Sequence, residues 1–379
     1  MNHKKNRNIC FANAIKLRNK IISKKVIDDS TKMIKTESRK IGKLSKKLKS
    51  QNRIIPNADK DNPNSQSSLI RNSSKIKCTV CSELIPRNEK ENSMSFIEHP
   101  FFINHKMCSK HEHTTRKCVA CHRLEPYNQK YSTLFYESYD KERVARYPMT
   151  CAQFICGSCE RTAIMNNDEM DSIWNEVLDF LDFMCNIPIN DEIRNIPVAS
   201  IDTSVLDKLI DTSMDEELNY SSHDEINCHG ICLSEKADLD SSRNSIIGIL
   251  CLRGLPKELT ASILAHEAIH AWLKLHPLYG LFGPLPPIVE EGCCQLASYL
   301  YLEHKIFLSS KQKSVISQSE IELCQYIQYC IKHNTNSIYN EGFRMASTIF
   351  CSLKSQCKLT LGDLLNYVLI HNQFPAIST

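Results

Sequence analysis

Four short pairs of metal-binding side chains between residues 78 and 159 constrain the fold of this chain more than any other feature. The members of each pair are separated by two residues, so a tight turn can present both side chains to one tetrahedral zinc ion. Taken in sequential order, the pairs predict two structural zinc sites, each with four protein ligands and no position open for water. The predicted ligands are Cys78, Cys81, Cys108 and His111 for the first site, and Cys118, Cys121, Cys156 and Cys159 for the second.

The order of pairing leaves a cross-braced arrangement open, although the sequential order matches LIM modules better. His99, His113 and Cys151 are spare ligand candidates. The remaining cysteines, which include Cys293 and Cys294, do not pair in this way, and we interpret them as small core residues. Because no secretory signal precedes these cysteines, metal binding is favoured over disulfides.

A second motif, His266-Glu267-Ala268-Ile269-His270, lies in a run predicted to be helical. Residues four apart share one face of a helix. Both histidines can therefore point an imidazole at one metal ion, and Glu267 can reach a metal-bound water. Zinc with three protein ligands and one open position is catalytic, so the motif predicts a catalytic zinc site.

The third ligand has three candidates. His276 follows His270 by six positions, but six residues rotate a helix by about 600°, which turns His276 away from the histidine face. Glu291 stands early in the next predicted helix, and Glu291-Gly292 resembles a segment in which gluzincins place a zinc ligand. We therefore predict Glu291 as the ligand and Glu290 as a neighbouring or substrate-facing carboxylate.

The surroundings of the motif predict the local architecture. An apolar run at Ile246–Leu252 is typical of a buried strand, which we expect to pair with an extended substrate. No Pro or Gly interrupts the chain after Pro256 until Pro277, which favours a long helix over 256–275. Further helices are predicted near Ile173–Met184, Ile288–Lys305, Glu320–Lys332, Phe343–Leu353 and Leu361–Leu369.

The charge distribution divides the chain. Residues 1–77 hold 21 Lys/Arg against 5 Asp/Glu, although the whole chain of 379 residues carries a net charge of only +4. This segment is also rich in Asn and Ser, so we interpret it as a disordered basic arm. The arm is a solvated tail in the simpler interpretation and an anchor for nucleic acid or an anionic membrane in the other, and we favour the tail.

Several stretches resemble the ubiquitin-activated LIM-domain peptidases first known as organ-size regulators in plants. The resemblance covers roughly residues 78–375 and is most specific over Gly248–Glu303. Plant members also carry acidic ubiquitin-interacting helices and a further LIM module ahead of this region, where the present chain has its basic arm. The matching stretches are CTVC, EHPFF, CSKHEH, CVACHRLEP, CGSC, GICLSEK, GLPKELTASILAHEAIHAWLKL, VEEGCCQLASYLYLE and SIYNEGFR.

The resemblance implies a peptidase that clips regulatory proteins of the ubiquitin system, with protein substrates and with ubiquitin or ubiquitin ligases as partners. In such an enzyme Glu267 accepts the proton of the zinc-bound water. A further donor must stabilise the oxyanion. Tyr339, in the matching SIYNEGFR stretch, is the first candidate for that donor, and Arg344 is the second.

These predictions combine into an α+β chain with a gluzincin-like zinc metallopeptidase domain, one catalytic zinc and two structural zincs. The predicted parts are a disordered basic arm (1–77), a LIM-like double-zinc module (78–165), a connecting region (166–245) and the peptidase domain (246–379). The main alternative is a non-catalytic LIM-like zinc adaptor that mediates protein–protein interaction. With no secretory or membrane-spanning segment in the sequence, the expected location is the cytoplasm, with the nucleus as a second location.

Overall fold

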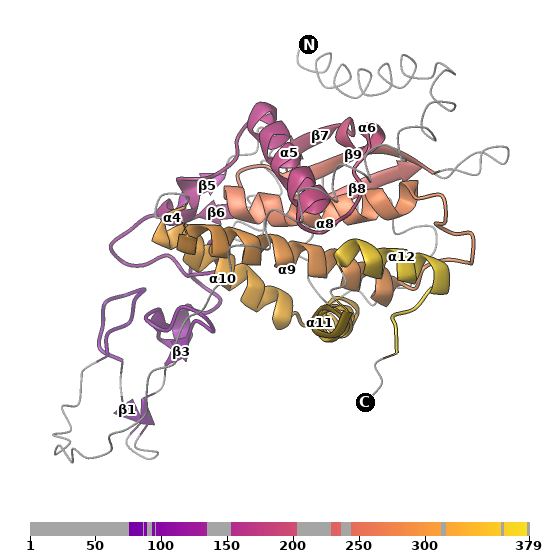
Figure 1. The fold of residues 1–379 in the computed structure, drawn as a ribbon. Coiled ribbons are helices and arrows are strands. Elements are labelled where there is room, and N and C mark those ends of the chain that lie inside the picture. Colours follow the sequence, from indigo (N-terminus) through magenta and orange to yellow (C-terminus); the bar gives the residue numbers. More distant parts are fainter. Residues whose placement is uncertain are drawn as a thin grey trace, which may run out of the picture. The chain divides into compact units, whose positions relative to one another are not determined.

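The computed structural model describes residues 76–85, 87–88, 93–94, 96–134, 153–202, 229–235, 244–311, 316–357 and 360–376 (Figure 1). All of these belong to the second of two compact units, which begins at Ser74. The predicted basic arm therefore lies outside the described residues, except for its last two positions. Helices and strands both contribute, which confirms the α+β class. None of the helices in these ranges combines the length and the apolar character that a membrane crossing requires.

The zinc-module region is built from short antiparallel hairpins that hold two similar turns. In the first turn, Ser82 N donates to Cys78 O, and in the second, His122 N donates to Cys118 O. Ser82 and His122 both have a positive φ, of 62° and 58°, so each turn closes through the left-handed region. The elements are β1 (Arg87–Asn88), β2 (Ser93–Met94), β3 (Ile97–Glu98), β4 (Lys106–Met107), the 3₁₀ turn η1 (Ser109–His111), β5 (Ser132–Leu134), β6 (Gln153–Ile155) and α4 (Gly157–Glu160).

A three-stranded sheet follows, and its strand order corrects one prediction. The predicted strand is present as β9 (Ser245–Leu252), but β9 is the central strand. It pairs in parallel with β7 (Val198–Ile201) and antiparallel with β8 (Gly230–Glu235). Strands therefore flank β9 on both sides over Ile249–Cys251, so β9 is not the free edge that an extended substrate would need along its whole length. Among the described strands of this sheet, β7 and β8 are the edges.

Residues 166–245, predicted as a connecting region, contribute to the same sheet and core. Besides β7 and β8, they supply α5 (Asn167–Phe183) and the short α6 (Asp191–Arg194). The α5 helix begins where the side chain of Asn166 accepts a hydrogen bond from Glu169 N, which caps the helix. Its buried face packs on both α8 and the sheet.

The remaining elements are five long helices at the predicted places. The first is α8 (Lys257–Leu275), almost all of it buried. Capping boxes start two others, at Ser317 with Glu320 and at Thr360 with Asp363. The other helices are α9 (Pro287–Lys311), α10 (Gln318–Lys332), α11 (Ser337–Cys357) and α12 (Leu361–His371).

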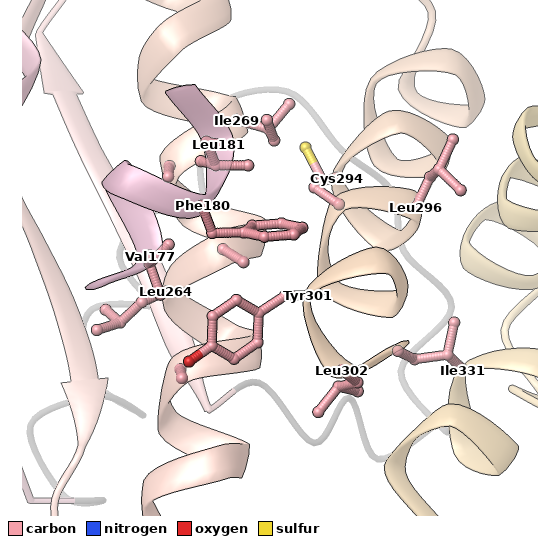
Figure 2. Close-up of a cluster of buried hydrophobic side chains, with 14 of the residues drawn as sticks. Val177, Phe180, Leu181, Leu264, Ile269, Cys294, Leu296, Tyr301, Leu302 and Ile331 are labelled. Carbon is pink, nitrogen blue, oxygen red and sulfur yellow. The ribbon is translucent and has the colours of Figure 1, made fainter. Parts of the chain in front are cut away.

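The core lies where α5, α8, α9 and α10 meet (Figure 2). Phe180 of α5 packs edge-on against Tyr301 of α9, with ring centroids 5.4 Å apart. The buried Tyr301 hydroxyl donates to Glu176, which also accepts from Lys305, so these three side chains are paired. This packing joins α9 to α5. The labelled side chains of the core are Val177, Phe180, Leu181, Leu264, Ile269, Cys294, Leu296, Tyr301, Leu302 and Ile331.

The chain that leaves the zinc-module region is joined to the start of α8 by backbone hydrogen bonds. Ile164 N donates to Leu255 O, and Gly254 N donates to Ile164 O, both at 2.9 Å. Lys257 N, the first of the helix, donates to Thr162 O at 2.8 Å. Because no side chain caps this helix, Thr162 O satisfies one of its free N–H groups.

Candidate metal centre

Two helices bring the predicted ligands of the HExxH motif together. On α8, His266 Nε2 and His270 Nε2 lie 3.2 Å apart and face each other. From α9, Glu291 Oε2 lies 3.1 Å from His266 Nε2, and Glu291 Oε1 lies 3.4 Å from His270 Nε2. The structure therefore gathers two imidazole nitrogens and one carboxylate around a common point, with donor types that suit zinc.

The electrostatics of this cluster fit a cation. Glu291 Oε2 is buried and makes no hydrogen bond within the described part of the chain. Burial opposes ionisation of Glu291, but the close ring nitrogens of His266 and His270 and their charge hold the pKa of this carboxyl well below its ordinary value. Burial likewise disfavours the imidazolium form of His270, yet Cys294, Glu290 and Glu291 raise its pKa. A bound metal ion would compensate the negative charge of the same carboxylates.

Glu290 occupies a different position from Glu291. Its Oε1 accepts a hydrogen bond of 2.7 Å from His270 Nδ1, on the side of the ring away from His266. Its Oε2 accepts a 3.1 Å hydrogen bond from the hydroxyl of Tyr279. Burial opposes the charge of Glu290, but the hydrogen bond from His270 lowers its pKa. Glu290 therefore orients His270 and is not placed as a third donor.

His276, the other alternative ligand, lies apart from this cluster. It ends α8, where its Nδ1 accepts from Leu278 N at 3.2 Å and its ring packs on Trp272 with centroids 4.9 Å apart. These contacts occupy His276. The helix ends at Leu275 and His276 is extended, so its separation from the cluster does not come from the continuing helix that was predicted.

Glu267, between the two histidines, lies under the edge strand β8. It is only 7% exposed. A Cβ atom added to Gly230 of β8 would lie 3.4 Å from Glu267 Oε1 and 2.4 Å from the side chain of Ile263. Only a glycine lets β8 approach α8 so closely. The edge strand and Glu267 therefore form one wall of the centre.

Tyr339 approaches from α11. Its ring lies 6.4 Å from the ring of His266, between centroids. The α11 helix is close because Gly342 packs directly on Gly292 of α9, where an added Cβ on either residue would clash with the backbone of the other helix. Arg344, the second candidate for an oxyanion donor, is exposed on α11 and lines a shallow hollow with other α11 residues.

The two cysteine-rich clusters also assemble as the sequential order predicts. In each cluster, the ligand atoms of four side chains lie within 4.8 Å of one another. In the second, Cys121 Sγ and Cys156 Sγ are 3.7 Å apart, and Arg123 donates to both sulfurs. In the first, His111 Nε2 is buried without a hydrogen-bond partner in the described residues, as expected of a metal-ligating nitrogen. Both clusters could hold a metal ion.

The spare ligand candidates have other positions. His99 Nε2 bonds to Cys121 O, and its Nδ1 accepts from the backbone of Phe101 and Phe102, so His99 stabilises the turns of the module. His113 is exposed and lies beside Glu112. Cys151 lies outside the described residues.

Comparisons with known proteins agree with this geometry. A family model described as "DA1-like: Protein DA1" matches residues 239–365, which include α8, α9 and α11. LIM domain-containing protein HDR3 of Oryza sativa subsp. japonica is 28% identical, over 79% of this chain and 62% of its own length. Protein DA1 of Arabidopsis thaliana is 26% identical, over 71% of this chain and 52% of its own length. These matches support the DA1-type family for this chain.

This DA1-type chain spans about half to three fifths of the length of these relatives. Protein DA1-related 2 of Arabidopsis thaliana, also 26% identical, is matched over 58% of its length. No solved structure gives a significant match. Together, the family and the two cysteine-rich clusters identify a LIM-like zinc-binding protein.

Two residues of the centre of this DA1-type chain were not found from the sequence. Cys294 was interpreted as a core residue, and it is fully buried, but its sulfur also lies within 4.8 Å of ligand atoms of His266 and His270. Its position three residues after Glu291, on the same helical face, was the available signal. Tyr279 lies in the turn-rich connection, where no periodicity predicts the direction of a side chain.

Proposed function

We propose that this DA1-type chain is a zinc-dependent endopeptidase. The observation that carries the proposal is the convergence of His266, His270 and Glu291 from two helices. Glu267 follows His266 in α8 and is buried next to Gly230 of β8. Two nitrogens and one carboxylate leave a tetrahedral ion one open position, which a catalytic site requires and a structural site lacks. Zinc bound there would lower the pKa of its water and polarise a substrate carbonyl.

The roles of the protein side chains follow from their positions. Glu267 accepts the proton of the attacking water and later delivers it to the leaving amine. Tyr339 donates a hydrogen bond to the oxyanion from the α11 side, because its ring lies near that of His266. Glu290 holds His270 in the tautomer that presents Nε2 to the ion.

The substrate lies along β8 in this proposal. As an edge of the described sheet, β8 offers backbone groups that an extended peptide can pair with. Gly230, at the start of β8, is the strand residue next to Glu267. A peptide paired with β8 therefore passes close to Glu267, which the central strand β9 does not allow.

Regulatory proteins of the ubiquitin system are the proposed substrates, with ubiquitin or ubiquitin ligases as partners. This part of the proposal rests on the resemblance of the sequence motifs to ubiquitin-activated LIM-domain peptidases, because nothing in the described site selects one protein sequence. The two cysteine-rich clusters have four protein donors each, which favours structural zinc over a catalytic role. We place the protein in the cytoplasm and, secondarily, in the nucleus.

The test replaces Glu267 with glutamine. Glu267→Gln keeps the three metal donors, so the protein should still hold three zincs, while cleavage falls about 10²- to 10⁴-fold with loss of the general base. Glu303→Gln, at an exposed position of α9, is the matched control and should leave both properties unchanged. Metal analysis gives the zinc content, and a comparison of new protein N-termini in cells gives the cleavage.

The same measurements separate the peptidase from a zinc adaptor. An adaptor that uses only the cysteine-rich clusters holds two zincs, and Glu267→Gln leaves the pattern of N-termini as it is in the wild type. Three zincs combined with N-termini that disappear in Glu267→Gln, and persist in Glu303→Gln, support the peptidase.

A further inference from the structure

A row of three side chains leads away from the metal centre into the connection between α8 and α9. The hydroxyl of Tyr279 donates to Glu290 Oε2 at 3.1 Å, and Glu290 Oε1 accepts from His270 Nδ1 at 2.7 Å. On its other side, His270 faces His266 and Glu291 through Nε2. A residue of the connection is thus linked to a proposed metal ligand through one carboxylate.

The hydrogen bond from Tyr279 restricts the Glu290 carboxylate. A carboxylate with one bonded oxygen can rotate about its terminal torsion, which is broad. With both oxygens bonded, to a tyrosine and to a histidine, Glu290 is held in one orientation. In that orientation Glu290 Oε1 accepts from His270 Nδ1–H, so the opposite nitrogen of the ring keeps its lone pair for a metal.

We propose that Tyr279 is a positioning residue of the metal centre, which holds Glu290 and thereby fixes the tautomer and ring orientation of His270. The inference rests on the proposed function to the extent that His270 is a zinc ligand. Tyr279 itself touches neither of the two histidines nor Glu291 in the contacts described, so its effect passes through Glu290.

The hydroxyl is not needed to fold the connection. Backbone hydrogen bonds already close it, since Tyr279 N donates to His276 O at 3.0 Å and Gly283 N donates to Gly280 O at 3.2 Å. Asn372, after α12, holds it from outside by donating to Phe282 O at 2.7 Å. A Tyr279→Phe variant keeps all of these bonds and the ring, and removes only the bond to Glu290.

The experiment measures how fast the full-length protein releases zinc to a chromophoric chelator. A His270→Ala variant identifies the phase that belongs to the His/His/Glu centre, as distinct from the cysteine-rich clusters. We expect Tyr279→Phe to speed that phase about fivefold, the effect of one lost hydrogen bond. Glu290→Ala should speed it about 10- to 100-fold. The control is Tyr367→Phe in α12, where the Tyr367 ring packs tilted against that of His371, and it should change nothing.

A double variant and a spectroscopic measurement separate positioning from mere packing. In the Glu290→Ala background, Tyr279→Phe should have no further effect on release, because the carboxylate that transmits it is gone. In the zinc-loaded wild type, nitrogen NMR should show His270 protonated at Nδ1, and Tyr279→Phe should weaken this signature.

The outcomes are distinct. If Tyr279→Phe releases zinc at the wild-type rate, or acts equally with and without Glu290, the positioning role is wrong while the peptidase proposal stands. If the wild type shows no zinc phase that His270→Ala removes, the proposed function itself fails.

Discussion

The two cysteine-rich clusters have the same ligand spacing but different surroundings. In the second cluster all four ligands are buried and belong to the main hydrophobic core, together with α5, α8 and α9. In the first, only Cys78 is fully buried, and it packs in a small separate core with Ile85, Met107 and Leu124. In the first cluster Cys108 N lies 3.4 Å from Cys78 Sγ, and in the second Cys156 N lies 3.4 Å from Cys118 Sγ. The local turns are thus alike, and the difference comes from what packs around them.

This difference assigns the clusters different structural roles. The chain that follows Cys159 continues directly into the hydrogen bonds with the start of α8, the helix that carries the HExxH motif. No such link to α8 is seen for the first cluster within the described residues. A metal in the second cluster therefore supports the helix of the proposed catalytic centre, whereas a metal in the first organises mainly its own segment.

Removal of one thiolate from each cluster is the strongest test of this comparison. Structural zinc contributes about 10–16 kcal/mol of apparent binding free energy in small zinc-finger peptides. That is comparable with the whole stability of a typical protein, about 5–15 kcal/mol. We expect Cys121→Ser to lower the midpoint of thermal unfolding by at least about 10 °C, because the main core loses its metal.

Cys81→Ser is the matched variant in the first cluster. It should also lose one zinc, but should shift the main unfolding transition by no more than about 2 °C, because its small core can open locally. Calorimetry with zinc analysis of both variants measures the contrast. Equal shifts of the main transition would show that the two clusters are equally coupled to the rest of the protein.

The sequence predicted which side chains gather in both clusters but not this contrast. The spacing of two residues between ligands is a local property, so it identifies Cys78–Cys81 and Cys118–Cys121 equally well. Burial depends on long-range packing, such as the contact between Tyr326 of α10 and the second turn at His122. Nothing in the local sequence of either turn encodes that contact.

The same limit applies to the candidate centre and to the sheet. Helical periodicity was sufficient to place His266 and His270 on one face, and the turn-rich connection allowed Glu291 to return to them. The strand order of the sheet was harder to predict, because the apolar run of β9 indicates burial but not which strands lie beside it. Its parallel partner β7 is separated from β9 by β8 and by the segment 203–228, which is outside the described residues, so that pairing is not local.

A second prediction concerns the junction between the second cluster and α8. Gly254 has a φ of +82°, and a Cβ at this position would lie 2.8 Å from Leu134 Cδ2 of β5. We expect Gly254→Ala to destabilise the protein by about 1–2 kcal/mol through backbone strain. Because Leu134 must also leave its preferred rotamer, about 0.5–1.5 kcal/mol is added.

Gly280→Ala provides the control for Gly254→Ala. Gly280 has a similar φ of +77°, but no atom lies within 4 Å of an added Cβ, so only the strain applies. Chemical denaturation of both variants gives the difference. A loss of stability at position 254 no larger than that at position 280 would contradict close packing of the zinc-module hairpin on this junction.

The smallest predicted effect concerns the contact between α10 and the second turn. The hydroxyl of the buried Tyr326 lies 2.7 Å from His122 Nδ1, and its ring packs 5.3 Å from that of Phe102, between centroids. Tyr326→Phe keeps the ring and removes the hydrogen bond, so we expect a loss of about 1 kcal/mol in the free energy of unfolding. Tyr329, one turn along α10, is stacked on His333, and no hydrogen bond joins its hydroxyl to the described residues of the module, so Tyr329→Phe should cost less. If the two variants unfold at the same denaturant concentration, the hydrogen bond to His122 does not help to hold the second cluster on α10, and apolar packing alone accounts for its burial.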